Sequence, residues 1–325
     1  MKKIYKDKDG KKYILTNQTG KYVYLRNETS NKHSIGEKFE LTKFKANFTK
    51  IEPNDKLYNN LHPESKIVLD FIRKNKGTLI KNVSSSNNKW NASGLSIQNI
   101  IGITKENSKT KPDIGNLELK VQKNIRSVNN APMALFTMAP KCFTKKINKR
   151  KSVTKYLASN YGQTDKMYPT NKCLSVNLSH DKYTTKGEYQ FKLNVDETEE
   201  KVFLVVRDLH TKNILTSDDF GYTFDDIYNR ITEKMENLII VSYDNKKVNN
   251  NEYFELMHSW LYLGLNRNKV IELLKNGQIF LNTGVDIKKN FKDKSKNGTL
   301  HDHGSEFRLK TNDLVNMYLS TETLY

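Results

Sequence analysis

Residues Leu117–Val121 alternate strictly between apolar and charged side chains, reading Leu-Glu-Leu-Lys-Val. Alternation with a period of two is typical of a strand with one buried face. We therefore expect the three apolar side chains to be buried, and Glu118 and Lys120 to share the opposite face. Charged residues are costly on an otherwise apolar strand unless they have a purpose there. The segment thus predicts a covered sheet that carries a functional group.

Helical stripes and short apolar runs alternate along the chain after residue 60. This mixture predicts an α/β or α+β domain, with a mixed sheet flanked by helices. Helices are expected at residues 63–77, Leu95–Ile103, Phe224–Met235, Phe254–Leu263 and Lys269–Asn276. Strands are expected at Asp113–Val121, Ala134–Met138, Val202–Val206, Leu238–Tyr243 and Ile279–Leu281.

The first 55 residues show a different pattern, of short strands separated by turn signals such as Asp9-Gly10 and Thr19-Gly20. Several strands at this spacing favour a small β-barrel of the SH3 or Tudor type. The expected strands are Lys12–Thr16, Tyr22–Leu25, Lys38–Leu41 and Phe44–Phe48. We predict an accessory β-barrel domain over residues 1–55, a linker at Pro53-Asn54-Asp55, and a second domain over residues 56–325.

The charge balance points to an anionic partner. The 325 residues include 55 Lys and Arg against 36 Asp and Glu, a net charge of +19. A surplus of this size most often indicates nucleic acid. The alternative is a solvated lysine-rich surface in the protein of an AT-rich genome, since Asn and Ile are also frequent.

Composition also restricts the compartment and the chemistry. No apolar run approaches the length of a membrane span, and no secretory signal is visible at the N-terminus. Cys142 and Cys173 can form neither a disulfide framework nor a four-cysteine zinc site, and they are expected to be incidental. We expect a cytoplasmic protein.

A dense basic run follows the strand expected at Ala134–Met138, and Phe143 and Tyr156 are interleaved with it. Positive charge placed along a duplex displaces counterions and gives affinity that does not depend on base sequence. A nuclear-localisation signal or a solvated loop is the alternative. The residues expected to contact the DNA backbone are Lys145, Lys146, Lys149, Arg150 and Lys151.

Asp113 lies just before the Gly115-Asn116 turn, which can fold it back toward Glu118. Two carboxylates and the Lys120 ammonium would then converge on one spot. Carboxylate oxygens, helped by a strand carbonyl such as that of Leu119, are suited to Mg²⁺. A metal with a nearby lysine can stabilise a phosphorus centre and activate water, as phosphodiester hydrolysis requires. On spacing alone, a solvated hairpin with an ion pair is the more frequent interpretation.

Four segments resemble the PD-(D/E)xK endonucleases, and more closely the MvaI/BcnI restriction endonuclease family, which is related to the mismatch-repair nickase MutH. Gly94–Ile103 resembles the helix ahead of the active site, and Pro132–Pro140 resembles the strand that follows it. Glu106-Asn107 with Pro112–Lys120 resembles the metal site. Leu300–Arg308 matches the family's H-D-H-G-x-x-F-R recognition segment. The likeness spans residues 60–325.

The resemblance implies a type II restriction enzyme that cuts double-stranded DNA at a short site with Mg²⁺, leaving 5′-phosphate and 3′-hydroxyl ends. It implies Asp113 and Glu118 as metal ligands, together with the Leu119 carbonyl, and Lys120 as the catalytic lysine. It also implies action as a monomer that nicks one strand at a time, paired with a cognate DNA methyltransferase. Gln98 stands where many MutH-type relatives carry a glutamate. An amide supplies no charge, so the number of cations stays open.

The resemblance also assigns His301, His303 and Arg308 to major-groove contacts, in a loop-to-strand segment. Arginine can donate two hydrogen bonds to guanine, and histidine can donate to an acceptor on a base edge. A His-x-His metal site or a solvated turn is the alternative. Asp286 and Lys288, on the preceding strand, are weaker candidates for groove contacts, and a core or surface role is equally open.

Two other functions compete with restriction. A MutH-like nickase shares the chemistry, whereas a non-enzymatic nucleic-acid-binding protein would share only the charge. His258 and Trp260 are expected to be packing residues on a helix. The N-terminal domain either contacts DNA or only adds stability.

Overall fold

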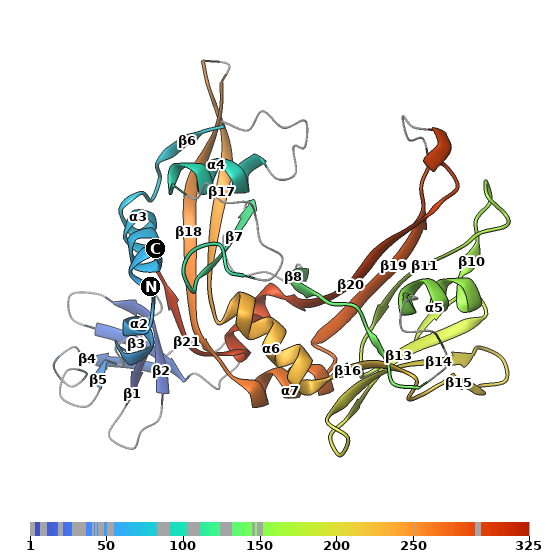
Figure 1. Cartoon of the computed structure of the whole chain (residues 1–325). Coiled ribbons are helices and arrows are strands. Elements are labelled where there is room, and N and C mark those ends of the chain that lie inside the picture. The colour runs from blue at the N-terminus through green and yellow to red at the C-terminus, as the bar shows by residue number, and fades with distance from the viewer. Residues whose placement is uncertain are drawn as a thin grey trace.

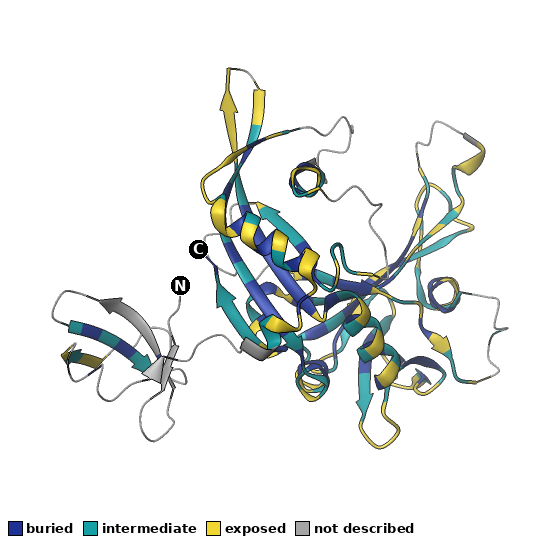
Figure 2. Ribbon diagram, turned by 60° about the vertical axis from the view of Figure 1, so that its left-hand side comes forward, coloured by how far each residue is buried: buried dark blue, intermediate teal, exposed yellow. Residues whose placement is uncertain are grey.

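The computed structural model of the chain describes residues 4–6, 12–18, 22–27, 37–40, 42, 44, 49–50, 55–82, 92–102, 111–123, 132–144, 147, 152–249, 251–289 and 294–324. Within these residues the strands form four sheets (Figure 1). Figure 2 shows buried residues concentrated on the central strands, with exposed residues on the outer faces of the helices. None of the described helices is long and apolar enough to cross a membrane.

One sheet, here called the β7 sheet, has the strand order β21-β18-β17-β7. Its edge strand β7 is parallel to β17, and the other pairings are antiparallel. The strands are β6 (Leu79–Lys81), which also pairs with β18, β7 (Glu118–Lys123), β17 (Asn237–Val248), β18 (Asn251–Leu265) and β21 (Tyr318–Thr323).

Helices cover both faces of the β7 sheet. On one face, α3 (Pro63–Lys74) and α4 (Ala92–Ile100) share a core with Leu117 and Leu119. On the other face lies the larger core, which includes residues of α6 (Phe224–Met235) and α7 (Arg267–Lys275). The α2 helix (Asp55–Asn59) precedes α3. Glu118 and Lys120 pair in register with β17 residues of the larger core, so they point toward the α6 face.

A second sheet, here called the β20 sheet, has the order β10-β11-β19-β20-β8. Helix α5 (Val153–Tyr161) packs against it, and β19 and β20 rise opposite the β17–β18 hairpin (Figure 1). Its strands are β8 (Pro132–Thr137), β10 (Gln163–Thr164), β11 (Lys172–Leu178), β19 (Ile279–Ile287) and β20 (Leu300–Lys310). The short 3-10 helices η1 (Lys294–Lys296) and η2 (Thr311–Asn316) flank β20 in sequence.

A third sheet has the order β12-β13-β14-β16-β9, and its strands β13, β14 and β16 contribute side chains to the larger core. Its strands are β9 (Lys141–Cys142), β12 (Thr184–Lys186), β13 (Tyr189–Asp196), β14 (Lys201–Asp208), β15 (Ile214–Thr216), which pairs with β14, and β16 (Phe220–Thr223).

The N-terminal sheet has the order β4-β3-β2-β1-β5 and its own small core around Val23 and Leu25. Its strands are β1 (Ile4–Lys6), β2 (Lys12–Gln18), β3 (Tyr22–Asn27), β4 (Glu37–Glu40) and β5 (Thr49–Lys50). No pairing joins β4 to β5 in the described part, so the sheet is not closed there and the SH3-like barrel stays a prediction. Phe44 is helical, so the strand expected from it is wrong at that residue, and residues 45–48 lie outside the described residues. Asp55, placed in the expected linker, instead begins α2.

The helix expected at Phe254–Leu263 is wrong, because these residues form the inner part of β18. This strand pairs with β17 on one side and with β21 and β6 on the other, and its apolar side chains enter both cores. A strand that is covered on both faces lacks clean alternation and cannot be distinguished from a helix by period alone. His258 and Trp260 therefore lie on a strand, where Trp260 packs against the larger core as expected. The remaining helices and strands expected after residue 60 are present; the helix at Phe224–Met235 has the expected bounds, and the others have shifted ends.

Candidate active site and recognition face

A tight turn brings Asp113 beside β7. Ile114 and Leu117 form an isolated bridge around Gly115 and Asn116, and Gly115 has a φ of +56°. A Cβ at Gly115 would lie 2.9 Å from both His62 Cβ and Ser65 Oγ. Glycine is therefore required twice, by its backbone conformation and by the close approach of α3.

Side chains from distant segments hold this turn in place. The Ser65 hydroxyl donates to the Ile114 carbonyl at 3.0 Å, and the His62 N–H donates to Asn116 Oδ1 at 3.0 Å. From the start of β17, the Asn237 amide donates to the Asn116 carbonyl at 3.1 Å. The turn is thus fixed to both α3 and β17.

Asp113 folds back along β7, as the sequence predicts. Its Oδ2 accepts a hydrogen bond from the Leu119 N–H at 3.0 Å. Because this N–H bonds to the Asp113 side chain, it is turned away from β17, the one neighbour of the edge strand β7. The N–H and C=O of one strand residue point the same way. The Leu119 carbonyl is therefore directed to the open edge on which Asp113 lies.

Glu118 is the buried centre of the group, with only 1% of its surface exposed. Its Oε1 lies 2.7 Å from Lys120 Nζ and 3.1 Å from Lys234 Nζ. Its Oε2 is buried and has no hydrogen-bond partner among the residues that the structure describes. The two acids and Lys120 that the sequence places together are together in the structure.

The surroundings of Asp113 disfavour its ionised form. Burial raises the pKa of the Asp113 carboxyl above its usual value, and the neighbouring Glu118 carboxylate raises it further. The Leu119 N–H, Lys120 and Lys234 act in the opposite direction on this pKa, but the net shift is upward. Two close carboxylates, a buried oxygen without a partner and a strand carbonyl fit a hard divalent cation.

Lys234 is the residue that sequence reasoning missed. It lies in the last turn of α6, more than 100 residues from Glu118, and no local motif marks it. Gln98 lies on α4, which packs against β7 through the core that contains Ile97 and Leu119. Glu106-Asn107 lies outside the described residues.

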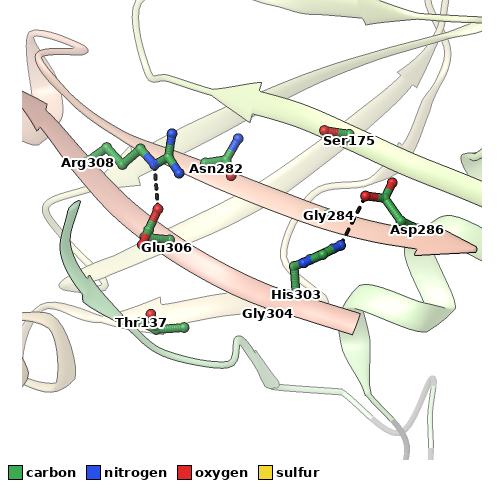
Figure 3. A pocket seen from close by; sticks show the side chains of 9 residues that line it. All are labelled: Thr137, Ser175, Asn282, Gly284, Asp286, His303, Gly304, Glu306 and Arg308. Atoms are coloured by element: carbon green, nitrogen blue, oxygen red, sulfur yellow. Dashed lines mark hydrogen bonds and ion pairs between the residues drawn. The ribbon is translucent and has the colours of Figure 1, made fainter. Parts of the chain in front are cut away.

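Of the expected recognition residues, His301, His303 and Arg308 lie on β20. Asp286 lies on β19, and Figure 3 shows it beside His303. His303 Nε2 lies 3.0 Å from Asp286 Oδ2, and the His301 and His303 rings are 4.4 Å apart. Arg308 donates through Nε to Glu306. Lys288 follows the last residue of β19, and it pairs through its backbone with Thr299 and Gly298.

A β-bulge brings these side chains to one face. The register of β19 and β20 shifts near Gly304, which has a φ of +78°. Before it the odd-numbered residues His301 and His303 are exposed, and after it the even-numbered Glu306 and Arg308 face solvent while Phe307 is buried. Bulges of this kind commonly re-aim side chains beside functional sites.

His303, Asp286, Glu306 and Arg308 are among the residues that line a pocket of about 330 Å³ (Figure 3). Its lining comes from four strands of the β20 sheet, namely β8, β11, β19 and β20. Sequence reasoning did not single out four of its lining residues. Ser175 and Asn282 lie outside the segments that resemble the family, whereas Thr137 and Glu306 lie inside such segments but were given no role there.

A His-x-His metal site finds no support here. No group of three or more His, Cys, Asp or Glu side chains suited to a metal occurs in the part of the chain that the structure describes. Cys142 and Cys173 are both unbridged. The five basic residues expected to contact the DNA backbone, Lys145, Lys146, Lys149, Arg150 and Lys151, lie outside the described residues.

The edge of a mixed sheet carries two acids and a lysine, and a second sheet presents a polar face, which together define the class of restriction-endonuclease-like nucleases. The model of the MvaI/BcnI restriction endonuclease family matches residues 70–318. Because this match covers well over half of the sequence, the chain belongs to that family and is a restriction endonuclease, a site-specific deoxyribonuclease.

Solved structures of the restriction endonuclease MvaI have a similar fold. Its complex with cognate DNA substrate gives a TM-score of 0.61 at 20% identity, covering 80% of this chain and 97% of that chain. MvaI in the absence of DNA gives a TM-score of 0.52 at 18% identity, covering 82% and 99%. No curated protein sequence matches the chain. At these identities, the structural likeness concerns the fold alone.

Proposed function

We propose that this type II restriction endonuclease hydrolyses double-stranded DNA at a short specific site with Mg²⁺. The ends expected are a 5′-phosphate and a 3′-hydroxyl. The observation that carries the proposal is the buried Glu118 carboxylate, which lies beside Asp113 and Lys120 and has one oxygen without a hydrogen-bond partner.

Each residue of the hairpin has a distinct role in this proposal. Asp113, Glu118 and the Leu119 carbonyl hold the cation through oxygen ligands. When bound, Mg²⁺ stabilises charge on the phosphate and lowers the pKa of a water molecule. The Lys120 side chain is 28% exposed, and its ammonium donates to the attacking water or to a phosphate oxygen. Gln98 contributes an amide at the edge of the site and no charge.

Base recognition is assigned to the face of β19 and β20. His301, His303 and Arg308 donate hydrogen bonds to base edges in the major groove. Asp286 accepts a hydrogen bond from a donor on a base edge. Lys288 is a further candidate for a groove contact. The basic run before α5 supplies contacts to phosphates, which position the duplex without reading it. The MvaI structure with its cognate DNA substrate supports DNA as the partner of this fold.

The biological setting completes the proposal. The chain acts as a monomer in the cytoplasm, nicks one strand at a time, and is paired with a DNA methyltransferase that protects the host. A methyltransferase gene beside that of the nuclease would favour this setting.

Cleavage of phage DNA with Mg²⁺, followed by sequencing of the fragment ends, tests the function. One short sequence should recur at every end, and chelation of the metal should stop cleavage. Asp113→Asn and Lys120→Ala should each slow cleavage by about 10³-fold or more while leaving DNA affinity unchanged. Either variant cutting at the wild-type rate would show that the site is misassigned.

A supercoiled plasmid that carries the recurring sequence separates the rival functions. Restriction gives linear product, whereas a MutH-like nickase stops at the nicked circle. Tight, salt-sensitive binding without metal-dependent cleavage would indicate a nucleic-acid-binding protein that is not an enzyme.

A further inference from the structure

A second ammonium group reaches the buried carboxylate of the hairpin from helix α6. Lys234 Nζ lies 3.1 Å from Glu118 Oε1, the same oxygen that Lys120 contacts. The Lys234 side chain is 12% exposed, against 28% for Lys120 and 2% for Glu118. Lys234 is therefore the more enclosed of the two lysines.

We propose that Lys234 is a positioning residue of the nuclease centre, which holds the Glu118 carboxylate with Oε2 turned toward the cation. This inference rests on the proposed function, because it takes Glu118 as a cation ligand. Lys234 itself touches neither the cation nor the phosphate.

The fold fixes the backbone that delivers Lys234. The next residue, Met235, is fully buried, and its carbonyl accepts a hydrogen bond from the Tyr318 hydroxyl at 2.7 Å. Two residues further on, Asn237 donates to the turn that precedes β7. The end of α6 and the catalytic hairpin are thus tied together, which keeps the Lys234 ammonium at a fixed place relative to Glu118.

The two lysines can then divide their work. A buried carboxylate is costly without a compensating charge and hydrogen bonds. If Lys120 turns toward water or phosphate during the reaction, Lys234 still neutralises Oε1 and holds the carboxylate plane. Groups that hold a metal ligand from behind typically change metal affinity or activity by about 10–100-fold when they are removed.

Electrostatic repulsion alone predicts the opposite result. An ammonium near a divalent cation repels it, so removal of Lys234 would tighten cation binding if charge were the only effect. Positioning predicts weaker binding instead. The direction of the change in affinity therefore separates the two.

The test is the binding of Mn²⁺ alone to the full chain, followed by electron paramagnetic resonance of the free ion. Lys234→Met should weaken Mn²⁺ binding by about tenfold or more, and Lys234→Arg should restore part of it. Lys275→Met is the matched control, because Lys275 also pairs with a glutamate from a helix, Glu197 at 2.7 Å, but at the surface. It should bind Mn²⁺ as the wild type does.

Mn²⁺ affinity in Lys234→Met equal to or tighter than that of the wild type would overturn the inference. If circular dichroism shows that this variant is unfolded, Lys234→Gln replaces it, and equal affinity in that variant is equally fatal. Failure of the wild type itself to bind Mn²⁺ and to cut DNA would remove the proposed function, and this inference with it. A wild type that binds and cuts, beside a Lys234→Met variant that does both equally well, would remove this inference only.

Discussion

The proposed catalytic hairpin (residues 113–120) and the proposed recognition face (β19 and β20) differ in how far they bury their charged side chains. The hairpin encloses Glu118 almost completely and takes most of its groups from residues 113–120. The recognition face exposes His301 and His303 and draws its lining from four strands. In both regions, acids and bases are already paired in the structure.

This difference in burial determines how easily each region can break its ion pairs. Exposed ion pairs contribute only about 0–1 kcal/mol, so Arg308 and His303 can exchange Glu306 and Asp286 for base edges at little cost. Breaking a buried pair costs far more. Glu118 therefore keeps its charge and its place, which suits a residue that acts on a cation rather than on a variable base.

The largest effect on DNA binding should come from the proposed recognition face. Arg308→Ala should weaken binding to the cleaved sequence by about 1–3 kcal/mol, because one arginine can make two hydrogen bonds to guanine. Arg308→Lys should not restore the affinity, since an ammonium lacks the planar fork. Filter binding at fixed salt measures both. Unchanged affinity in Arg308→Ala would contradict the assignment of base reading to this face.

A smaller effect should follow from straightening the bulge. Gly304→Ala places a side chain at a φ of +78°, with its Cβ 3.3 Å from Thr137 Cγ2, and should weaken specific DNA binding severalfold. Gly77→Ala is the control, because its φ of +73° is equally strained while its Cβ would meet nothing within 4 Å. Each should lose about 1 kcal/mol of stability. If both variants bind DNA equally well, the bulge does not aim the recognition residues.

The smallest effect concerns stability at the hairpin. The raised pKa of Asp113 means that the folded chain binds a proton there more tightly than the unfolded chain does, so ionisation costs stability at neutral pH. Asp113→Asn should therefore raise the Tm at pH 7 without added metal, and the gain should shrink as pH falls below the folded-state pKa. Calorimetry at several pH values measures this. A lower Tm of the variant at neutral pH would mean that the ionised Asp113 carboxylate stabilises the folded chain, which would contradict this account.

Local pattern was sufficient for the hairpin. The alternation of Leu117–Val121 fixes which side chains face together, and the Gly115-Asn116 turn returns Asp113 to the same strand. These interactions span only a few residues, whereas the contacts from His62, Ser65 and Asn237 that hold the turn come from distant segments. Local pattern was also sufficient for α6, whose predicted and observed bounds coincide at Phe224–Met235.

Features set by distant contacts could not be predicted. Lys234 contacts Glu118 only because α6 packs over the face of the sheet to which the Glu118 side chain points. The spacing of His303 and Arg308 would put them on opposite faces of a regular strand, and only the bulge at Gly304 brings them together. In β18 the surrounding strands, rather than the residues themselves, decide between strand and helix.

The most direct measurement is a crystal structure of the protein with its cleaved DNA sequence and Mn²⁺, using the anomalous scattering of the metal. We expect a manganese peak about 2.1 Å from an Asp113 oxygen, Glu118 Oε2 and the Leu119 carbonyl oxygen, beside the phosphate that is cut. A peak held by other residues, with Glu118 Oε2 still out of contact, would contradict the account.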